Sequence, residues 1–75
     1  MDVLTQLRDV LAGEFEIDPQ LITREAHLLD DLDIDSIDAI DMLARLRELT
    51  GKDLPAEGLK EVRTVGDVVA LVERA

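Results

Sequence analysis

Residues 35–51 read DSIDAIDMLARLRELTG, and this stretch decides the fold. Its apolar side chains recur at the spacing of three and four residues that marks one face of an α-helix. The pattern predicts a helix over residues 36–50, with Asp35 or Ser36 as the N-cap. Gly51 is the expected C-terminal stop, because glycine readily adopts the left-handed conformation that ends many helices. The expected core face consists of Ala39, Met42, Leu43, Leu46 and Leu49.

The same helix carries a second apolar stripe, offset from the first, which consists of Ile37, Ile40 and Ala44. A single helix face cannot bury both stripes. We therefore expect the second stripe to lie on the surface.

Three further helices follow from the flanking sequence. The N-terminal segment predicts a helix over about residues 3–13, with Asp2 as the N-cap and Gly13 as the stop. A short helix is expected over residues 55–62, where Pro55 suits the first turn. Residues 64–67 resemble a capping box that opens a last helix, and its apolar face comprises Val65, Val68, Val69 and Val72.

The segment over residues 15–34 has no clear period and contains Asp18-Pro19 and the Leu28-Leu29 pair. It predicts a long loop with one short turn, whose apolar residues pack on the core. Loops of this length in compact domains are often functional, and this one leads to Ser36. The predicted architecture is all-α: a four-helix bundle with three longer helices, one short third helix and a long loop between the first two, formed by residues 1–75 as a single domain.

Composition excludes several function classes. The 75 residues include no cysteine, so Leu, Val and Ile, 25 residues in all, have to supply the core. A net charge of −10 and a single aromatic residue, Phe15, argue against nucleic-acid binding. The sequence predicts neither a signal peptide nor an apolar run long enough for membrane insertion. We expect a cytoplasmic monomer.

The negative charge is concentrated around the one serine of the chain. Residues 25–44 contain seven acidic residues and no Lys or Arg, whereas residues 45–75 contain six of each charge. Ser36 lies inside the acidic run and at the start of the predicted helix. A solvated acidic surface is ordinary in a soluble protein, but its concentration around one hydroxyl indicates a site.

The residues offer little for catalysis. His27 is the only histidine, and we interpret it as a solvated loop residue rather than a general base. Asp31, Asp33 and Asp35 imitate the opening of a calcium-binding loop, but Ser36 replaces its glycine and the closing glutamate is missing. We therefore expect no dedicated metal site, only weak divalent binding by charge attraction, and no enzymatic activity.

Taken alone, Ser36 is explained as a helix cap. The surrounding segment favours another interpretation. Asp35-Ser36-Ile37-Asp38, preceded by residues 28–34 and followed by Ile40-Asp41, Gly51 and Leu54-Pro55, resembles the phosphopantetheine attachment site of the acyl carrier protein family. The resemblance covers essentially the whole chain in length, acidity and helix order.

The resemblance implies that Ser36 carries a 4′-phosphopantetheine arm whose thiol holds acyl groups as thioesters, for enzymes of fatty acid or related lipid biosynthesis. The domain itself would catalyse nothing. Family members shelter the acyl chain between their helices, and we hypothesise that this pocket is lined by Met42, Leu43, Leu46, Val62 and Val68.

The resemblance also implies partners: a phosphopantetheinyl transferase, and acyl-transferring and acyl-modifying enzymes with basic docking patches. The partner surface would comprise Asp35, Ile37, Asp38, Ile40, Asp41, Ala44 and Arg45. Fatty-acid carriers tend to keep this helix acidic to its end, whereas this chain has Arg45 and Arg47. The arginines indicate either ordinary helix chemistry, with Arg45 paired to Asp41, or a specialised set of partners.

Two alternatives remain open. The cargo on the arm is an acyl, aminoacyl or polyketide unit, since partner enzymes choose it and no residue of the carrier distinguishes them. The other alternative is a small acidic interaction module that uses the second apolar stripe without any modification, with Ser36 as a cap only.

Overall fold

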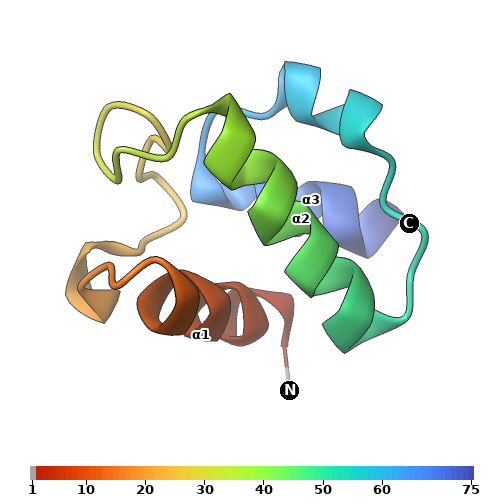
Figure 1. Cartoon of the computed structure of the whole chain (residues 1–75), viewed down its shortest axis with the longest axis horizontal. Coiled ribbons are helices and arrows are strands. Elements are labelled where there is room, and N and C mark those ends of the chain that lie inside the picture. The colour runs from red at the N-terminus through yellow and green to blue at the C-terminus, as the bar shows by residue number, and fades with distance from the viewer. Residues whose placement is uncertain (1) are drawn as a thin grey trace.

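A computed structural model describes residues 2–75 as an all-α fold with three α-helices and two 3-10 helices. The elements follow one another as α1 (Val3–Glu14), η1 (Pro19–Leu21), α2 (Ser36–Thr50), η2 (Ala56–Glu61) and α3 (Val65–Arg74). In Figure 1, the three α-helices and η2 surround a common interior, and a long loop joins α1 to α2. The predicted all-α bundle, with three longer helices and one short third helix, is confirmed.

Helix α1 begins where the sequence predicts and ends slightly later. The Asp2 carboxylate caps it by accepting a hydrogen bond from the Thr5 backbone N–H at 2.7 Å. The helix continues through Gly13 to Glu14 and ends at Phe15, so the prediction of Gly13 as the stop is wrong. Glycine weakens a helix but does not end it by itself. The buried face of α1 consists of Leu7, Val10 and Leu11.

The loop between α1 and α2 is packed onto the core through alternating apolar residues. It contains the 3-10 helix η1, which Asp18 caps by accepting the Gln20 backbone N–H at 2.9 Å. Residues 24–25 and 28–32 form further turns that the sequence did not predict. Two of its leucines are exceptions to the predicted packing, because Leu21 is 55% exposed and Leu29 is 62% exposed. Leu29 follows buried Leu28 within a turn, where neighbouring side chains point in different directions. The buried residues of the loop are Ile22, Ala26, Leu28, Leu32 and Ile34.

Helix α2 matches its predicted bounds, and its two stripes separate as expected. Ala39, Met42, Leu43 and Leu46 are buried, whereas Ile37 and Ile40 are 72% and 48% exposed. The assignment of Leu49 to the core is wrong, since this side chain is 54% exposed. It lies in the last turn, beyond the last core position of the helix. Gly51 ends α2 with a φ of 70°, in the left-handed conformation that glycine adopts without steric cost.

The C-terminal third contains η2 and α3. The predicted short helix is a 3-10 helix, and Pro55 precedes it as the N-cap rather than standing in its first turn. The capping box at the start of α3 is confirmed. The Thr64 hydroxyl accepts the Asp67 backbone N–H at 3.2 Å, and the Asp67 carboxylate accepts the Thr64 backbone N–H at 3.1 Å.

Helix α1 packs against both α2 and α3, and η2 bridges the other side by packing against the same two helices. By contrast, no Cα atom of α2 lies within 8 Å of a Cα atom of α3, although both helices are described in full. Side chains therefore fill the space between α2 and α3. Every buried side chain among residues 2–75 is apolar. Within this same part of the chain, no helix has the length and apolar character needed to cross a membrane.

Candidate functional site

Ser36 is the first residue of α2 and is exposed to solvent. Asp35, not Ser36, caps the helix: its Oδ1 accepts the Asp38 backbone N–H at 2.9 Å. Within residues 2–75 the Ser36 hydroxyl makes no hydrogen bond. The interpretation of Ser36 as a mere cap is therefore wrong, and its Oγ is available for chemistry.

The segment that leads to Ser36 is held by backbone hydrogen bonds. The Ile34 N–H donates to the Leu28 carbonyl at 2.7 Å, and the Leu28 N–H donates to the Arg63 carbonyl at 2.9 Å. Leu32 and Ile34 are buried, whereas Asp33 and Asp35 are exposed. This alternation anchors the chain on the core and leaves the carboxylates in solvent immediately before the serine.

A groove of about 690 Å³ opens beside Ser36, between the start of α2, the preceding loop and η2. One wall comes from Leu28, Ile34 and Ala39, which are buried core residues. The opposite wall comes from η2 and the residues that follow it. Its volume is in the range of small-molecule sites, and the residues that line it are His27, Leu28, Leu29, Asp30, Ile34, Asp35, Ser36, Ala39, Ile40, Ala56, Leu59, Lys60, Val62 and Arg63.

The residues of the hypothesised acyl pocket lie in two places. Val62 lines the groove beside Ser36. The other four are fully buried in the core, three on α2 and one on α3, and they are Met42, Leu43, Leu46 and Val68. The groove and this part of the core meet at Ala39, which belongs to both.

The proposed partner surface lies along the solvent side of α2. Asp35, Asp41 and the two isoleucines are exposed, and Asp38 and Ala44 are partly exposed. The acidic side chains and the apolar stripe therefore share one face of the molecule beside Ser36. This arrangement suits a surface that meets basic patches on its partners.

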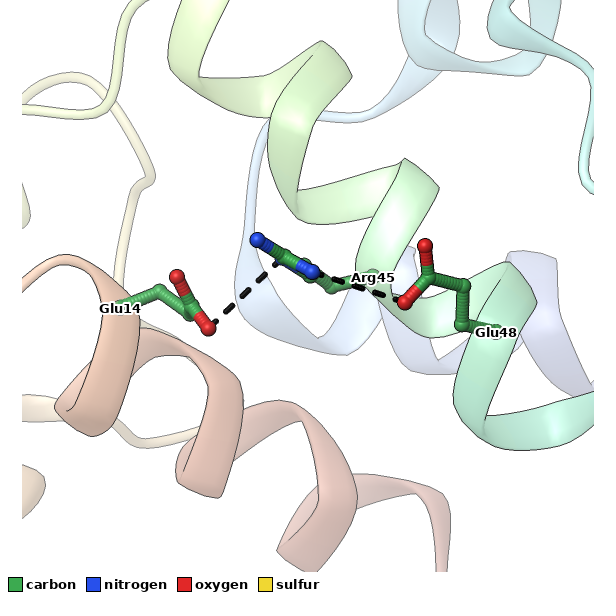
Figure 2. Close-up of polar contacts among 3 residues, drawn as sticks. All are labelled: Glu14, Arg45 and Glu48. Atoms are coloured by element: carbon green, nitrogen blue, oxygen red, sulfur yellow. Dashed lines mark ion pairs between the residues drawn. The ribbon is translucent and has the colours of Figure 1, made fainter.

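Arg45 is held away from that arrangement by two carboxylates (Figure 2). Its Nε lies 3.7 Å from Glu14 Oε1 at the end of α1, and its Nη1 lies 3.5 Å from Glu48 Oε2. The expected pairing of Arg45 with Asp41 is wrong, because the guanidinium points toward α1 and the following turn of α2. Arg47 forms no ion pair within residues 2–75.

His27 lines the groove beside Ser36, but its side chain makes no hydrogen bond within residues 2–75. His27 is exposed, and its backbone N–H donates to Asp31 Oδ2 at 2.7 Å. Among residues 2–75, the acidic and histidine side chains form no group of three or more that is arranged to hold a metal ion.

Sequence reasoning missed three groove residues in and just after η2, namely Leu59, Lys60 and Arg63. Their signal in the sequence is weak: two basic residues three positions apart, in a segment balanced in charge. Only the folded chain brings them beside Ser36.

Comparison with known proteins agrees with this geometry. A family model described as "Phosphopantetheine attachment site" matches residues 5–72. Acyl carrier protein 2 of Ralstonia nicotianae is 46% identical over 72 residues, which cover 96% of this chain and 89% of that protein. The chain belongs to the acyl carrier protein family. An acyl carrier role in fatty acid or related lipid synthesis follows from this membership, with 4′-phosphopantetheine as the cofactor.

Two more distant relatives show how widely this family extends. The acyl carrier protein of Lactobacillus acidophilus is 31% identical over 72 residues, covering 96% of this chain and 90% of that protein. The meromycolate extension acyl carrier protein of Mycolicibacterium aurum is 33% identical over 73 residues, covering 97% of this chain and 75% of that protein. The family predicted from the sequence is thus confirmed, and so is the cofactor.

Proposed function

We propose that Ser36 is the attachment site of 4′-phosphopantetheine and that the chain delivers acyl groups on this arm to partner enzymes. The observation that carries the proposal is the free, exposed Ser36 hydroxyl beside a groove, with Asp35 taking the capping role. When attached, 4′-phosphopantetheine supplies a terminal thiol that holds an acyl group as a thioester. The chain itself supplies position and recognition rather than catalysis.

Each neighbour of Ser36 has a definite task in this proposal. Asp35 fixes the start of α2, so that Oγ keeps one position relative to the groove. The buried pair Leu32 and Ile34 holds the approach to the helix on the core. The apolar groove walls offer the arm a surface partly shielded from water.

The acyl pocket is proposed between α2 and α3. Met42, Leu43 and Leu46 on α2 and Val68 on α3 fill the space between two helices whose backbones stay apart. Aliphatic side chains in such a space can repack around a guest, and the thioether of Met42 adapts its shape most readily. Val62 would guide the acyl chain from the groove inward. An acyl chain with no proton contacts to these five residues in the loaded protein would refute this pocket.

Partner recognition is proposed to use Asp35, Asp38 and Asp41 together with the apolar stripe. A phosphopantetheinyl transferase and acyl-processing enzymes would present basic patches to these carboxylates. Such electrostatic contacts favour rapid, short-lived encounters, which suits a monomeric cytoplasmic carrier that visits many enzymes. Because Arg45 is already paired with Glu14 and Glu48, its share in this surface is to hold α2 against α1.

Intact mass spectrometry tests the attachment site. Co-expression with a phosphopantetheinyl transferase should add the mass of one phosphopantetheine group to the chain, and Ser36→Ala should abolish the addition. Thr23→Ala is the matched control, because Thr23 also carries an aliphatic hydroxyl and is exposed, but does not line the groove. An unchanged mass with a transferase that loads other carriers would leave the chain as an unmodified interaction module.

A further inference from the structure

The groove beside Ser36 has a basic side. Lys60, in the last turn of η2, and Arg63, just after η2, line the same groove as Ser36. They are the only cationic Lys or Arg side chains among its lining residues. Neither forms an ion pair within residues 2–75. Two cations without partners therefore face the groove that receives the arm.

The backbone of this basic side is tied to the attachment segment. The Arg63 carbonyl accepts the Leu28 N–H at 2.9 Å, and the Arg63 N–H donates to Asp67 Oδ2 at 3.0 Å. Leu28 in turn accepts the Ile34 N–H, two residues before Ser36. In Figure 1, the chain that follows η2 passes behind the first turn of α2, and residues of both segments line the groove. Backbone hydrogen bonds thus tie Arg63 to the segment before Ser36, and Lys60 lies three residues before Arg63.

The groove also contains carboxylates, which would repel a negatively charged group attached to Ser36. Asp30 and Asp35 line the groove, and neither reaches a cation within ion-pair distance. A phosphodiester formed on Ser36 would add one more negative charge beside these carboxylates. Arg binds phosphate oxygens through its planar fork of donors, and Lys acts as a mobile point charge. Both kinds of cation are present on the facing wall.

We propose that Lys60 and Arg63 bind the phosphodiester of the arm on Ser36 and hold the proximal part of the arm in the groove. This inference rests on the proposed function. Leu28, Leu59 and Val62 supply the apolar surface on which the aliphatic part of the arm lies. The pair keeps the unengaged arm close to the carrier, and a partner enzyme draws it out by competing for the phosphate.

The test uses the loaded full-length chain with a nitroxide spin label on the thiol of the arm. Its readout is the paramagnetic broadening of the backbone amides of Leu59 and Val62, measured by NMR at low salt. The variant is Lys60→Gln with Arg63→Gln. Arg47→Gln with Arg74→Gln is the control, because it removes the same charge from exposed positions outside the groove. Mass spectrometry first confirms one arm per chain, and circular dichroism confirms that each variant is folded.

We expect the broadening at Leu59 and Val62 to fall about threefold or more in the groove variant, as the loss of two exposed ion pairs would predict, and to stay unchanged in the control. Raising salt to about 1 M, where screening acts within about 3 Å, should reproduce the loss in the unmodified sequence without any substitution. Equal broadening in all three proteins, or no salt effect, would overturn this inference while the mass still supports the proposed function. A chain that takes no arm at all would overturn the proposed function, and the inference would fall with it.

Discussion

The Asp35 carboxylate accepts the backbone N–H of Asp38 at 2.9 Å, and Ser36 lies between these two residues without taking part in the bond. Capping and attachment are therefore divided between adjacent residues. The division matters because a hydroxyl oxygen that accepts a capping hydrogen bond is a weaker nucleophile than a free one.

Two substitutions should separate these roles. Asp35→Ala removes the cap and should lower the free energy of unfolding by about 1 kcal/mol, whereas Ser36→Ala should change it by less than about 0.5 kcal/mol. Thermal unfolding of the unloaded proteins measures both. Asp30→Ala is the control for charge, because Asp30 is exposed and accepts no hydrogen bond within residues 2–75. Equal losses for Asp35→Ala and Ser36→Ala would contradict the division.

Local signals explain how far the sequence predicted the fold. The caps at Asp2 and Thr64 and the stop at Gly51 are hydrogen-bonding or backbone properties of single residues, and all three are confirmed. For α2 the sequence offered Asp35 or Ser36 as the cap, and the structure has Asp35. The acidic, apolar and serine positions at the start of α2 were predicted for the same reason, since one helix sets their spacing.

The errors concern features that depend on tertiary structure. Leu29 and Leu49 are as apolar as their buried neighbours, and only the path of the chain leaves them in solvent. Arg45 has Asp41 at a suitable helical spacing, but α1 brings Glu14 within reach of the same guanidinium. The groove beside Ser36 combines residues 27–40 with residues 56–63, two stretches separated in the sequence, so no local pattern reports it.

A second prediction concerns the hydrogen bond between Lys52 and the C-terminal turn of α3. The Lys52 ammonium donates to the Val72 carbonyl in the last turn of α3 at 3.0 Å, and so joins the segment after α2 to a helix C-terminus. A cation at this end of a helix is favourable. Lys52→Met should lower the free energy of unfolding by about 1 kcal/mol, equivalent to about 4–8 °C in Tm for a domain of this size.

Lys60→Met is the matched control for this change, because Lys60 is exposed and makes no hydrogen bond or ion pair within residues 2–75. Its Tm in the unloaded protein should stay close to that of the unmodified chain. A similar loss of Tm in both variants would show that the hydrogen bond from Lys52 to Val72 does not stabilise the fold.

A third prediction separates the two arginines of α2. Arg45→Glu places a third carboxylate beside Glu14 and Glu48, which lie 3.7 and 3.5 Å from the guanidinium atoms they now pair with. All three side chains are at least half exposed, so the loss in free energy of unfolding should be about 1 kcal/mol at low salt and smaller at high salt. Arg47→Glu, which breaks no ion pair, should leave the Tm almost unchanged.

For turnover by partner enzymes, by contrast, we expect Arg47→Glu to have the larger effect. Arg47 lies seven residues after Ile40, two helical turns along the same exposed face. Turnover of the loaded variants by a general set of fatty-acid synthase enzymes measures the difference, and Arg47→Glu should raise it more than Arg45→Glu. No gain for Arg47→Glu would argue against a specialised set of partners.

The last prediction concerns pH and the capping box of α3. The Arg63 and Thr64 backbone N–H groups donate to the Asp67 carboxylate and lower its pKa below the usual value of 3.8. Because the folded pKa lies below the unfolded one, the ionised carboxylate stabilises the fold above about pH 4, and this contribution is lost as pH falls through the folded pKa. Asp67→Asn should therefore lower the Tm at pH 7, and the difference from the unmodified chain should shrink in acid.

Asp53→Asn is the control, since Asp53 is exposed and accepts no hydrogen bond within residues 2–75. A Tm difference for Asp67→Asn that stays constant from pH 7 into acid would show that the charge of Asp67 contributes nothing beyond the hydrogen bonds that an amide oxygen also accepts.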